Sequence, residues 1–462
     1  MTNTLSAASL VAIVACLALP ANAMAQDHDH SAPAEEEAAE PPADHSGMDH
    51  SQMDHGQMDQ GQMDHGQMDH GQMGHDEAAT EPPSSAEGSG TSRLPGNEGG
   101  GHGIHLATGD WMVMTHGFAS LQYTDHGGPR GDDKLYSTSM LMLMAEHQPD
   151  WGRIQLKSMF SLEPAMDANG YPNLFASGET AGGEPLVDRQ HPHDLFMELA
   201  ARVDVDVAPG TSLFLYGGPV GEPALGPSAF MHRGSAALNP EPPITHHWFD
   251  STHITYGVVT AGISSRRFQL EASAFRGAEP DEERWNIETP KLDSWSVRGT
   301  WTPDPSWALQ ASYGEITEPE AVHPGEDERR FTASAHYSQG GLSAMGAFSS
   351  KTRIAAGEEN TTSTAWLAEA SYDFAERHTI FGRFENVLND ELFPDHDDPL
   401  HDQAFRVSKF QAGYAYSLPL GEAFSLALGG SLSAYAKPEE LDAAYGDNPL
   451  GYTLFARLTL GQ

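Results

Sequence analysis

Apolar and polar side chains alternate along most of the chain, from about Trp111 to the C-terminus. Alternation with a period of two residues is the pattern of a β-strand with one apolar face. In the stretch DSWSVRGTW, for example, Trp295, Val297 and Trp301 share one face, whereas Ser296 and Arg298 share the other. The alternation therefore predicts an all-β protein.

The connections between these segments alternate as well. Seven short turns, near residues 149–152, 209–211, 264–266, 303–305, 339–341, 375–377 and 418–421, interleave with eight long polar stretches, near 124–134, 164–193, 219–252, 276–292, 315–329, 351–362, 387–404 and 436–449. An even number of antiparallel strands with short turns at one end and long loops at the other is typical of outer-membrane β-barrels. We therefore predict a transmembrane β-barrel of about sixteen antiparallel strands. Fourteen or twelve strands, and a soluble sandwich or propeller, are the alternatives.

The part before the barrel divides into two regions. An apolar run around Cys16, the only cysteine, is too short to span a bilayer as a helix and is followed by the small residues ANAMA, so residues 1–25 are expected to be a signal peptide. Residues 26–105 hold almost no aliphatic or aromatic side chains and are expected to be disordered. Residues 106–462 then form the barrel. The expected location is the outer membrane of a Gram-negative bacterium, with the tail in the periplasm.

A repeat of five residues runs through this tail. Six methionines recur at every fifth position, and a histidine follows two residues later in five of the six units. Thioether sulfur favours Cu(I), and imidazole suits Cu(II), Cu(I) and Zn(II). The repeat therefore predicts copper binding as Cu(I) and Cu(II), with silver and zinc as further candidates; a solvated linker is the alternative. The predicted ligands are Met48, His50, Met53, His55, Met58, Met63, His65, Met68, His70, Met73 and His75.

The formal charge of the chain is −42. A nucleic-acid-binding protein would need a basic face, so this charge excludes nucleic acid as a partner. Cationic partners fit better, and metal ions are the simplest of these. The expected partners are copper ions, the lipid of the outer membrane and periplasmic copper carriers that deliver the metal.

The repeats beginning MDHSQMDHGQ, followed by a C-terminal barrel, resemble the bacterial copper resistance protein B family, or a sister family. The resemblance lies in the repeats and in the order of the two regions, and it includes no motif within the barrel. It implies an outer-membrane location, copper binding and a role in copper tolerance. It implies no ligand residue in the barrel.

Two long loops on the expected outer side are rich in histidine. One contains DRQHPHD and the other contains THHWFDSTH. Because neighbouring strands lie ~4.8 Å apart, loops could bring the two groups together, and five imidazoles with two aspartates would make a Cu(II) or Zn(II) site. The alternative is a polar plug formed by an inward-folded loop. The predicted ligands are His191, His193, His246, His247 and His253.

Methionines also recur at alternate positions in the first barrel strands. Because Glu146, Lys157 and Glu163 should avoid lipid, their faces are expected to line the lumen. This register places Met112, Met114, His116, Met140, Met142 and Met144 in the lumen as further predicted ligands, together with Met159. A register shifted by one residue would turn the whole set toward lipid. Alternation in DLFMELAARVDVDV likewise places Met197 and Leu199 on one face of their strand and Glu198 on the other.

These features favour a copper-binding protein without enzymatic activity, whose tail captures copper and whose barrel anchors the tail or passes the metal on in transport. A general porin or uptake channel with a metal-binding appendage is one alternative. A metalloenzyme that uses the five histidines within the barrel is another, although the sequence shows no nucleophile–base pair.

Overall fold

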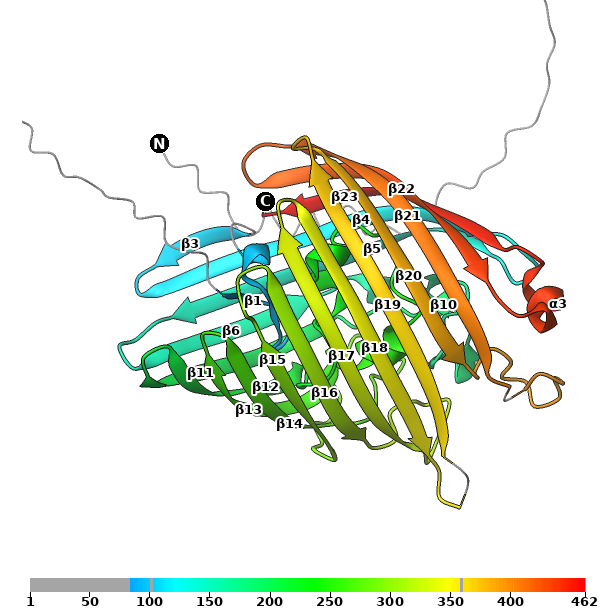
Figure 1. Ribbon diagram of the computed structural model, residues 1–462, viewed down its shortest axis with the longest axis horizontal. Helices are drawn as coiled ribbons and strands as arrows, with labels where there is room; N and C mark the ends of the chain where they lie inside the picture. Colours follow the sequence, from blue (N-terminus) through cyan, green and yellow to red (C-terminus); the bar gives the residue numbers. More distant parts are fainter. Residues whose placement is uncertain (1–83, 100–102, 358–359, 402, 462) are drawn as a thin grey trace, which may run out of the picture. The chain divides into compact units, whose positions relative to one another are not determined.

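The computed structural model describes residues 84–99, 103–357, 360–401 and 403–461. In this part of the chain, sixteen antiparallel strands form a closed barrel (Figure 1), as the alternation predicts. The barrel strands are β4 (Trp111–His126), β5 (Asp133–His147), β6 (Gly152–Phe160), β11 (Phe196–Ala208), β12 (Thr211–Gly221), β13 (Thr255–Ser265), β14 (Phe268–Phe275), β15 (Ser294–Trp301), β16 (Trp307–Ile316), β17 (Asp327–Gln339), β18 (Leu342–Ile354), β19 (Thr361–Phe374), β20 (His378–Asn389), β21 (Phe405–Pro419), β22 (Phe424–Ala436) and β23 (Leu450–Leu460).

The smaller elements lie before the barrel and in its loops. They are the strands β1 (Ser85–Glu87), β2 (Arg93–Pro95), β3 (Ile104–Thr108), β7 (Tyr171–Pro172), β8 (Glu179–Ala181), β9 (Glu184–Leu186) and β10 (Arg189–Gln190), the one-turn helices α2 (His246–Phe249) and α3 (Asp442–Tyr445), and short 3-10 turns. No helix in the described ranges is long and apolar enough to span a membrane.

All seven predicted short turns join barrel strands, and all eight predicted long loops do the same at the other end. We call these the short-turn end and the long-loop end. The first strand closes the barrel by pairing with the last: Gly117–His126 of β4 lies opposite Gly451–Leu460 of β23. The remaining residues of β4, from Trp111 to Thr115, pair with β3. The sequence assigned the first residues of β3 to the tail, because a strand of five residues carries little periodicity.

The outward face of the barrel is apolar. Leu270, Leu432 and Leu450 are 62%, 71% and 63% exposed, and tryptophan and valine occupy many of the other outward positions. Aromatic pairs lie near both ends of the strands: Phe268 stacks on Trp301 at the short-turn end, and Trp295 lies against Tyr313 at the long-loop end. An apolar band with aromatic residues at its two edges is the surface that a transmembrane barrel presents to lipid.

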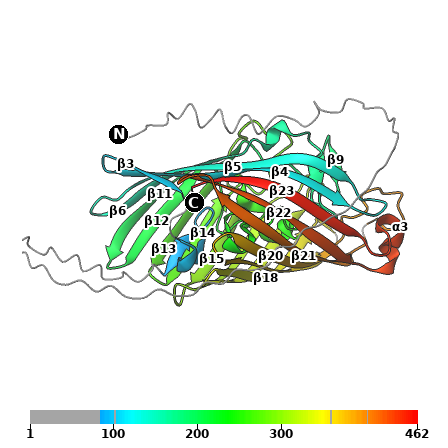
Figure 2. The ribbon, with the colours of Figure 1, turned by 90° about the horizontal axis from the view of Figure 1, so that it is seen from above.

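Residues 222–254, between β12 and β13, fold into the lumen, and we call them the lumenal loop. Buried ion pairs fix the loop to the opposite wall: Arg233 lies 2.7 Å from Glu369 of β19, and Glu241 lies 2.7 Å from Lys409 of β21. The strands β4–β5 and β18–β21 lie on opposite sides of the loop segments between them (Figure 2). The loop therefore crosses the lumen, as the alternative of an inward-folded loop predicts.

The segment Ser84–Glu98 also packs inside the barrel, and we call it the N-terminal hairpin. β1 and β2 pair with each other, and the tip residues between them are buried. The Gly90 carbonyl accepts a hydrogen bond from Lys157 Nζ at 2.8 Å, and the Thr91 carbonyl accepts one from Gln269 at 2.7 Å. The sequence assigned this hairpin to the disordered tail because it is rich in serine and glycine. In the structure, barrel side chains bind its backbone, which an apolarity pattern cannot reveal.

Candidate functional site

The strands β4, β5 and β6 place alternate side chains in the lumen in the predicted register. Met140, Met142 and Met159 are 5%, 4% and 3% exposed. Their neighbours on the other face, Leu143 and Leu156, are 41% and 48% exposed. The inward position of these methionines is therefore confirmed.

A β-bulge adds a methionine that the alternation assigned to the face opposite Glu198. The pairing of β11 with β6 shifts between Phe196 and Glu198, so that Met197 and Glu198, which are adjacent in sequence, are both buried. Met197 consequently packs with Met140, Met142 and Met159, and Met231 of the lumenal loop packs against the same group. The prediction that Met197 and Glu198 point to opposite faces was wrong, because strict alternation does not hold across a bulge.

Imidazoles extend this group of methionines. His116 Nε2 lies 3.2 Å from the sulfur of Met142, and the His116 ring lies 6.5 Å from the ring of His232. We define the His/Met cluster as His116, Met140, Met142, Met159, His193, Met197, Met231, His232, His246 and His253. Three of the predicted methionine ligands are not part of this cluster. Met112 is 44% exposed, and Met114 and Met144 are half-buried.

The structure brings together all five histidines of the two loops. Ring centroids of His246 lie 5.1 Å from His253 and 5.3 Å from His247, and His253 lies 5.4 Å from His193. His191 lies 6.1 Å from His246. The one-turn helix α2 presents His246 and His247, whereas His253 follows in a 3-10 turn (Ser251–His253) just before β13.

In three of these rings, Nδ1 makes the hydrogen bond that orients the imidazole. Nδ1 of His193 lies 2.8 Å from Glu163 Oε2, Nδ1 of His246 lies 2.8 Å from Asp250 Oδ1, and Nδ1 of His253 lies 2.7 Å from the Asp250 carbonyl. Nε2 of His193 and Nε2 of His253 are buried and make no hydrogen bond with the described residues. A histidine that binds a metal through Nε2 uses its Nδ1–H in this way.

Burial also sets the protonation of these rings. Burial lowers the pKa of His246, and it lowers the pKa of His253 well below its usual value. Burial lowers the pKa of His232 to about 3. These imidazoles are therefore neutral near pH 7 and keep a lone pair for a metal ion. His193 differs: burial opposes its charge, but the Glu163 carboxylate outweighs this and raises the pKa.

A small cavity lies between the two kinds of donor. Its volume is about 40 Å³, and its lining includes Met140, Glu163, His193 and Met231. A single water molecule or ion needs a cavity of ~10–15 Å³. The cavity thus has room for one ion beside a thioether and an imidazole.

His191 and His247 turn toward carboxylates. His191 Nδ1 lies 3.1 Å from Glu179, and His247 Nδ1 lies 3.5 Å from Glu279 and 3.6 Å from Glu320. Of the two aspartates expected among the ligands, Asp250 contacts the histidines, whereas Asp194 pairs with Arg284 at 3.2 Å. The loop carboxylates were missed because isolated glutamates in polar loops carry no recognisable spacing.

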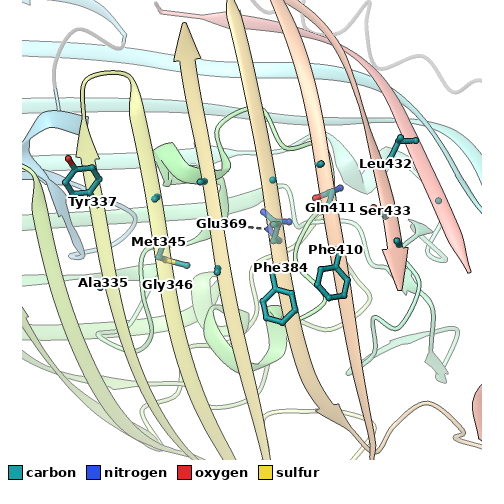
Figure 3. Close-up of a pocket in the computed structure, with 18 of the residues that line it drawn as sticks. Ala335, Tyr337, Met345, Gly346, Glu369, Phe384, Phe410, Gln411, Leu432 and Ser433 are labelled. Atoms are coloured by element: carbon teal, nitrogen blue, oxygen red, sulfur yellow. Dashed lines mark hydrogen bonds and ion pairs between the residues drawn. The ribbon is translucent and has the colours of Figure 1, made fainter. Parts of the chain in front are cut away.

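A larger pocket lies elsewhere, on the outward face of the barrel (Figure 3). It has a volume of about 980 Å³ and is lined mainly by small and apolar residues of β17–β23, with Phe384, Phe410 and Leu432 at its sides. This apolar lining suits lipid chains and offers few donors to an ion. The predicted ligands of the tail, from Met48 to His75, lie outside the described residues.

Searches for similar proteins relate the chain to porins by fold alone. OmpF of Salmonella typhi, solved in complex with daunomycin, matches with a TM-score of 0.50 and 9% identity over 77% of this chain and 100% of the other. OmpT of Vibrio cholerae matches with a TM-score of 0.48 and 10% identity over 77% and 100% of the two chains. No family model and no curated protein matches the sequence. The fold is thus that of outer-membrane β-barrel porins.

Proposed function

We propose that this chain is a copper-binding protein of the outer membrane of a Gram-negative bacterium, and that the His/Met cluster binds copper within the barrel lumen. The observation that supports the proposal most is the convergence of five methionines with imidazoles: Met142 lies 3.2 Å from His116, and one cavity is lined by Met140, Met231 and His193. Thioether and imidazole donors together favour Cu(I), and imidazole also accepts Cu(II). A lumen that served only diffusion would have no need of such donors.

The contacts inside the lumen favour a copper ion that moves through the barrel from one ligand to the next over one that diffuses freely. The lumenal loop crosses the barrel, and the N-terminal hairpin occupies the lumen next to it. Ser89 of the hairpin accepts a hydrogen bond from the Ala229 backbone at 2.7 Å, one residue before Phe230 and two before Met231. Arg93 of the hairpin donates to the carbonyl of Ser265, at the short turn between β13 and β14, at 2.8 Å. An ion that enters from the short-turn end therefore meets the hairpin before it meets the cluster. We propose that this end faces the periplasm.

The repeat in the tail suggests a second place, in the periplasm, where this protein would bind copper. Its predicted ligands are of the same chemical types as those of the cluster, and the repeat ends less than ten residues before the hairpin begins. We propose that the tail captures copper, or receives it from periplasmic carriers, and that the barrel anchors the tail or passes the metal on. Copper tolerance would be the physiological result.

A general channel is the second candidate, and the porin fold favours it. The two functions differ in what the lumenal sulfur atoms do. We propose to replace Met140 and Met142 with leucine, each of which costs less than ~1.5 kcal/mol because volume and apolarity are kept. Bound Cu(I) should fall while barrel assembly, measured by heat-shifted migration on a gel, stays unchanged. If copper binding is unchanged, the thioethers serve packing alone and the channel function is the better assignment.

A further inference from the structure

A second group of metal-binding side chains lies among the loops of the long-loop end. Ligand atoms of His247, Glu279 and Glu320 lie within 4.8 Å of one another. The three residues come from the lumenal loop, the loop between β14 and β15, and the loop between β16 and β17. We call them the carboxylate cluster. Two further groups of the same kind adjoin it, one through His247 with Glu179 and His191, and one through Glu320 with His323 and Glu391.

Two atoms of the carboxylate cluster lack hydrogen bonds. His247 is 5% exposed, and its Nδ1 has no hydrogen-bond partner within the described ranges. Oε1 of Glu279, which lies 3.5 Å away, is also buried and without one. A buried polar atom without a partner costs ~1–3 kcal/mol. A cation between the two atoms would remove this cost at both.

The third member is held as a carboxylate by a neighbouring cation. Glu320 Oε1 accepts a hydrogen bond from Lys351 Nζ at 2.7 Å. Glu320 Oε2 lies 4.0 Å from His323 Nε2. Glu320 Oε1 also lies 3.6 Å from His247 Nδ1, so Lys351 holds this carboxylate beside the imidazole.

We infer that the carboxylate cluster binds one divalent cation of borderline hardness, with Zn(II) and Cu(II) as the candidates. Two carboxylates and one imidazole suit such ions, whereas Cu(I) prefers thioether sulfur, which is absent from this set. The inference goes beyond the proposed function, because it uses different residues and carboxylate donors in place of thioethers. It stands whether or not the His/Met cluster binds copper.

The backbone around His247 is built to admit its ring. Gly178 has a φ of +106°, and a Cβ at this position would lie 2.6 Å from His247 Nδ1. Only glycine leaves room for the ring there. An alanine at position 178 would push the ring away from Glu279 without removing a ligand, which provides a second way to test the site.

The experiment counts zinc ions retained after equilibrium dialysis of the full chain in detergent. The test variant is Glu279→Gln, which removes one charge at an atom that makes no hydrogen bond. The control is Glu283→Gln, an exposed glutamate on the same loop. We expect the wild-type chain and the control to retain one zinc ion more than Glu279→Gln. We also expect Glu279→Gln to bind Cu(I) like the wild type, which separates this site from the His/Met cluster.

Equal zinc retention by Glu279→Gln and the wild type would overturn the inference. Heat-shifted migration shows whether each variant assembles. If Glu279→Gln does not assemble, Gly178→Ala decides: loss of one zinc ion in an assembled barrel supports the site, and full retention overturns it.

Discussion

Arg233 is the residue whose removal should release the lumenal loop. Its side chain is fully buried, and its guanidinium lies 2.7 Å from Glu369 and 3.3 Å from Asp250 and donates to the Ser228 carbonyl at 2.9 Å. Replacing one partner of a buried ion pair costs ~3–5 kcal/mol because the other charge stays buried. Arg233→Ala leaves Arg383 beside Glu369 at 2.9 Å, so we expect the lower value, about 3 kcal/mol.

A loss of about 3 kcal/mol shifts the balance between a closed and an open lumen roughly a hundredfold toward the open state. Single-channel recording in planar bilayers measures this shift directly. We expect Arg233→Ala to conduct ions more often or at larger amplitude than the wild type. Arg329→Ala is the control, because the pair of Arg329 with Glu315 is half-exposed and such pairs contribute ~0–1 kcal/mol. An assembled Arg233→Ala barrel with wild-type conductance would show that the ion pair does not hold the loop.

Three further substitutions test separate contacts. Leu143→Asp places a carboxylate on the lipid face, costs up to ~2 kcal/mol, and should lower the yield of heat-shifted barrel; normal assembly would mean that the register is inverted. Glu163→Ala removes the acceptor that orients His193 and should weaken Cu(I) binding by ~10–100-fold, measured by competition with a chelator; an unchanged affinity would exclude His193 as a ligand. Gly90→Ala puts a Cβ 2.8 Å from Glu222 at a φ of +54°, costs ~1–2 kcal/mol, and should make the N-terminal hairpin more sensitive to added protease; unchanged cleavage would show that the hairpin is held elsewhere.

The periodicity of the sequence predicts the barrel because a lipid-facing surface imposes it. Each outward position must be apolar, and each short turn must reverse the chain. The apolar–polar alternation and the turns therefore recur along all sixteen strands. The inward register of Met140 and Met142 follows from the same constraint, since Glu146 and Lys157 share their face. The inward position of Met197 cannot be predicted in this way, because the bulge breaks the alternation for one residue.

The sequence predicts the histidines of the candidate site but not its glutamates. His193, His246 and His253 are recognisable because imidazoles are rare and gather in two loops. Glu163 and Glu279 are not, because glutamate is common in polar loops and their role depends on distances between loops. The N-terminal hairpin shows the same limit: its backbone hydrogen bonds to barrel side chains leave no pattern in its own residues.

Copper K-edge X-ray absorption on a variant that lacks residues 44–76 tests the central claim most directly. Removing the repeat takes away the predicted ligands of the tail and leaves the described barrel residues intact. We predict that the purified barrel retains Cu(I) and that its spectrum contains both sulfur and nitrogen neighbours, as the His/Met cluster requires. An assembled barrel that retains no copper, or one whose copper has only nitrogen and oxygen neighbours, would contradict the account.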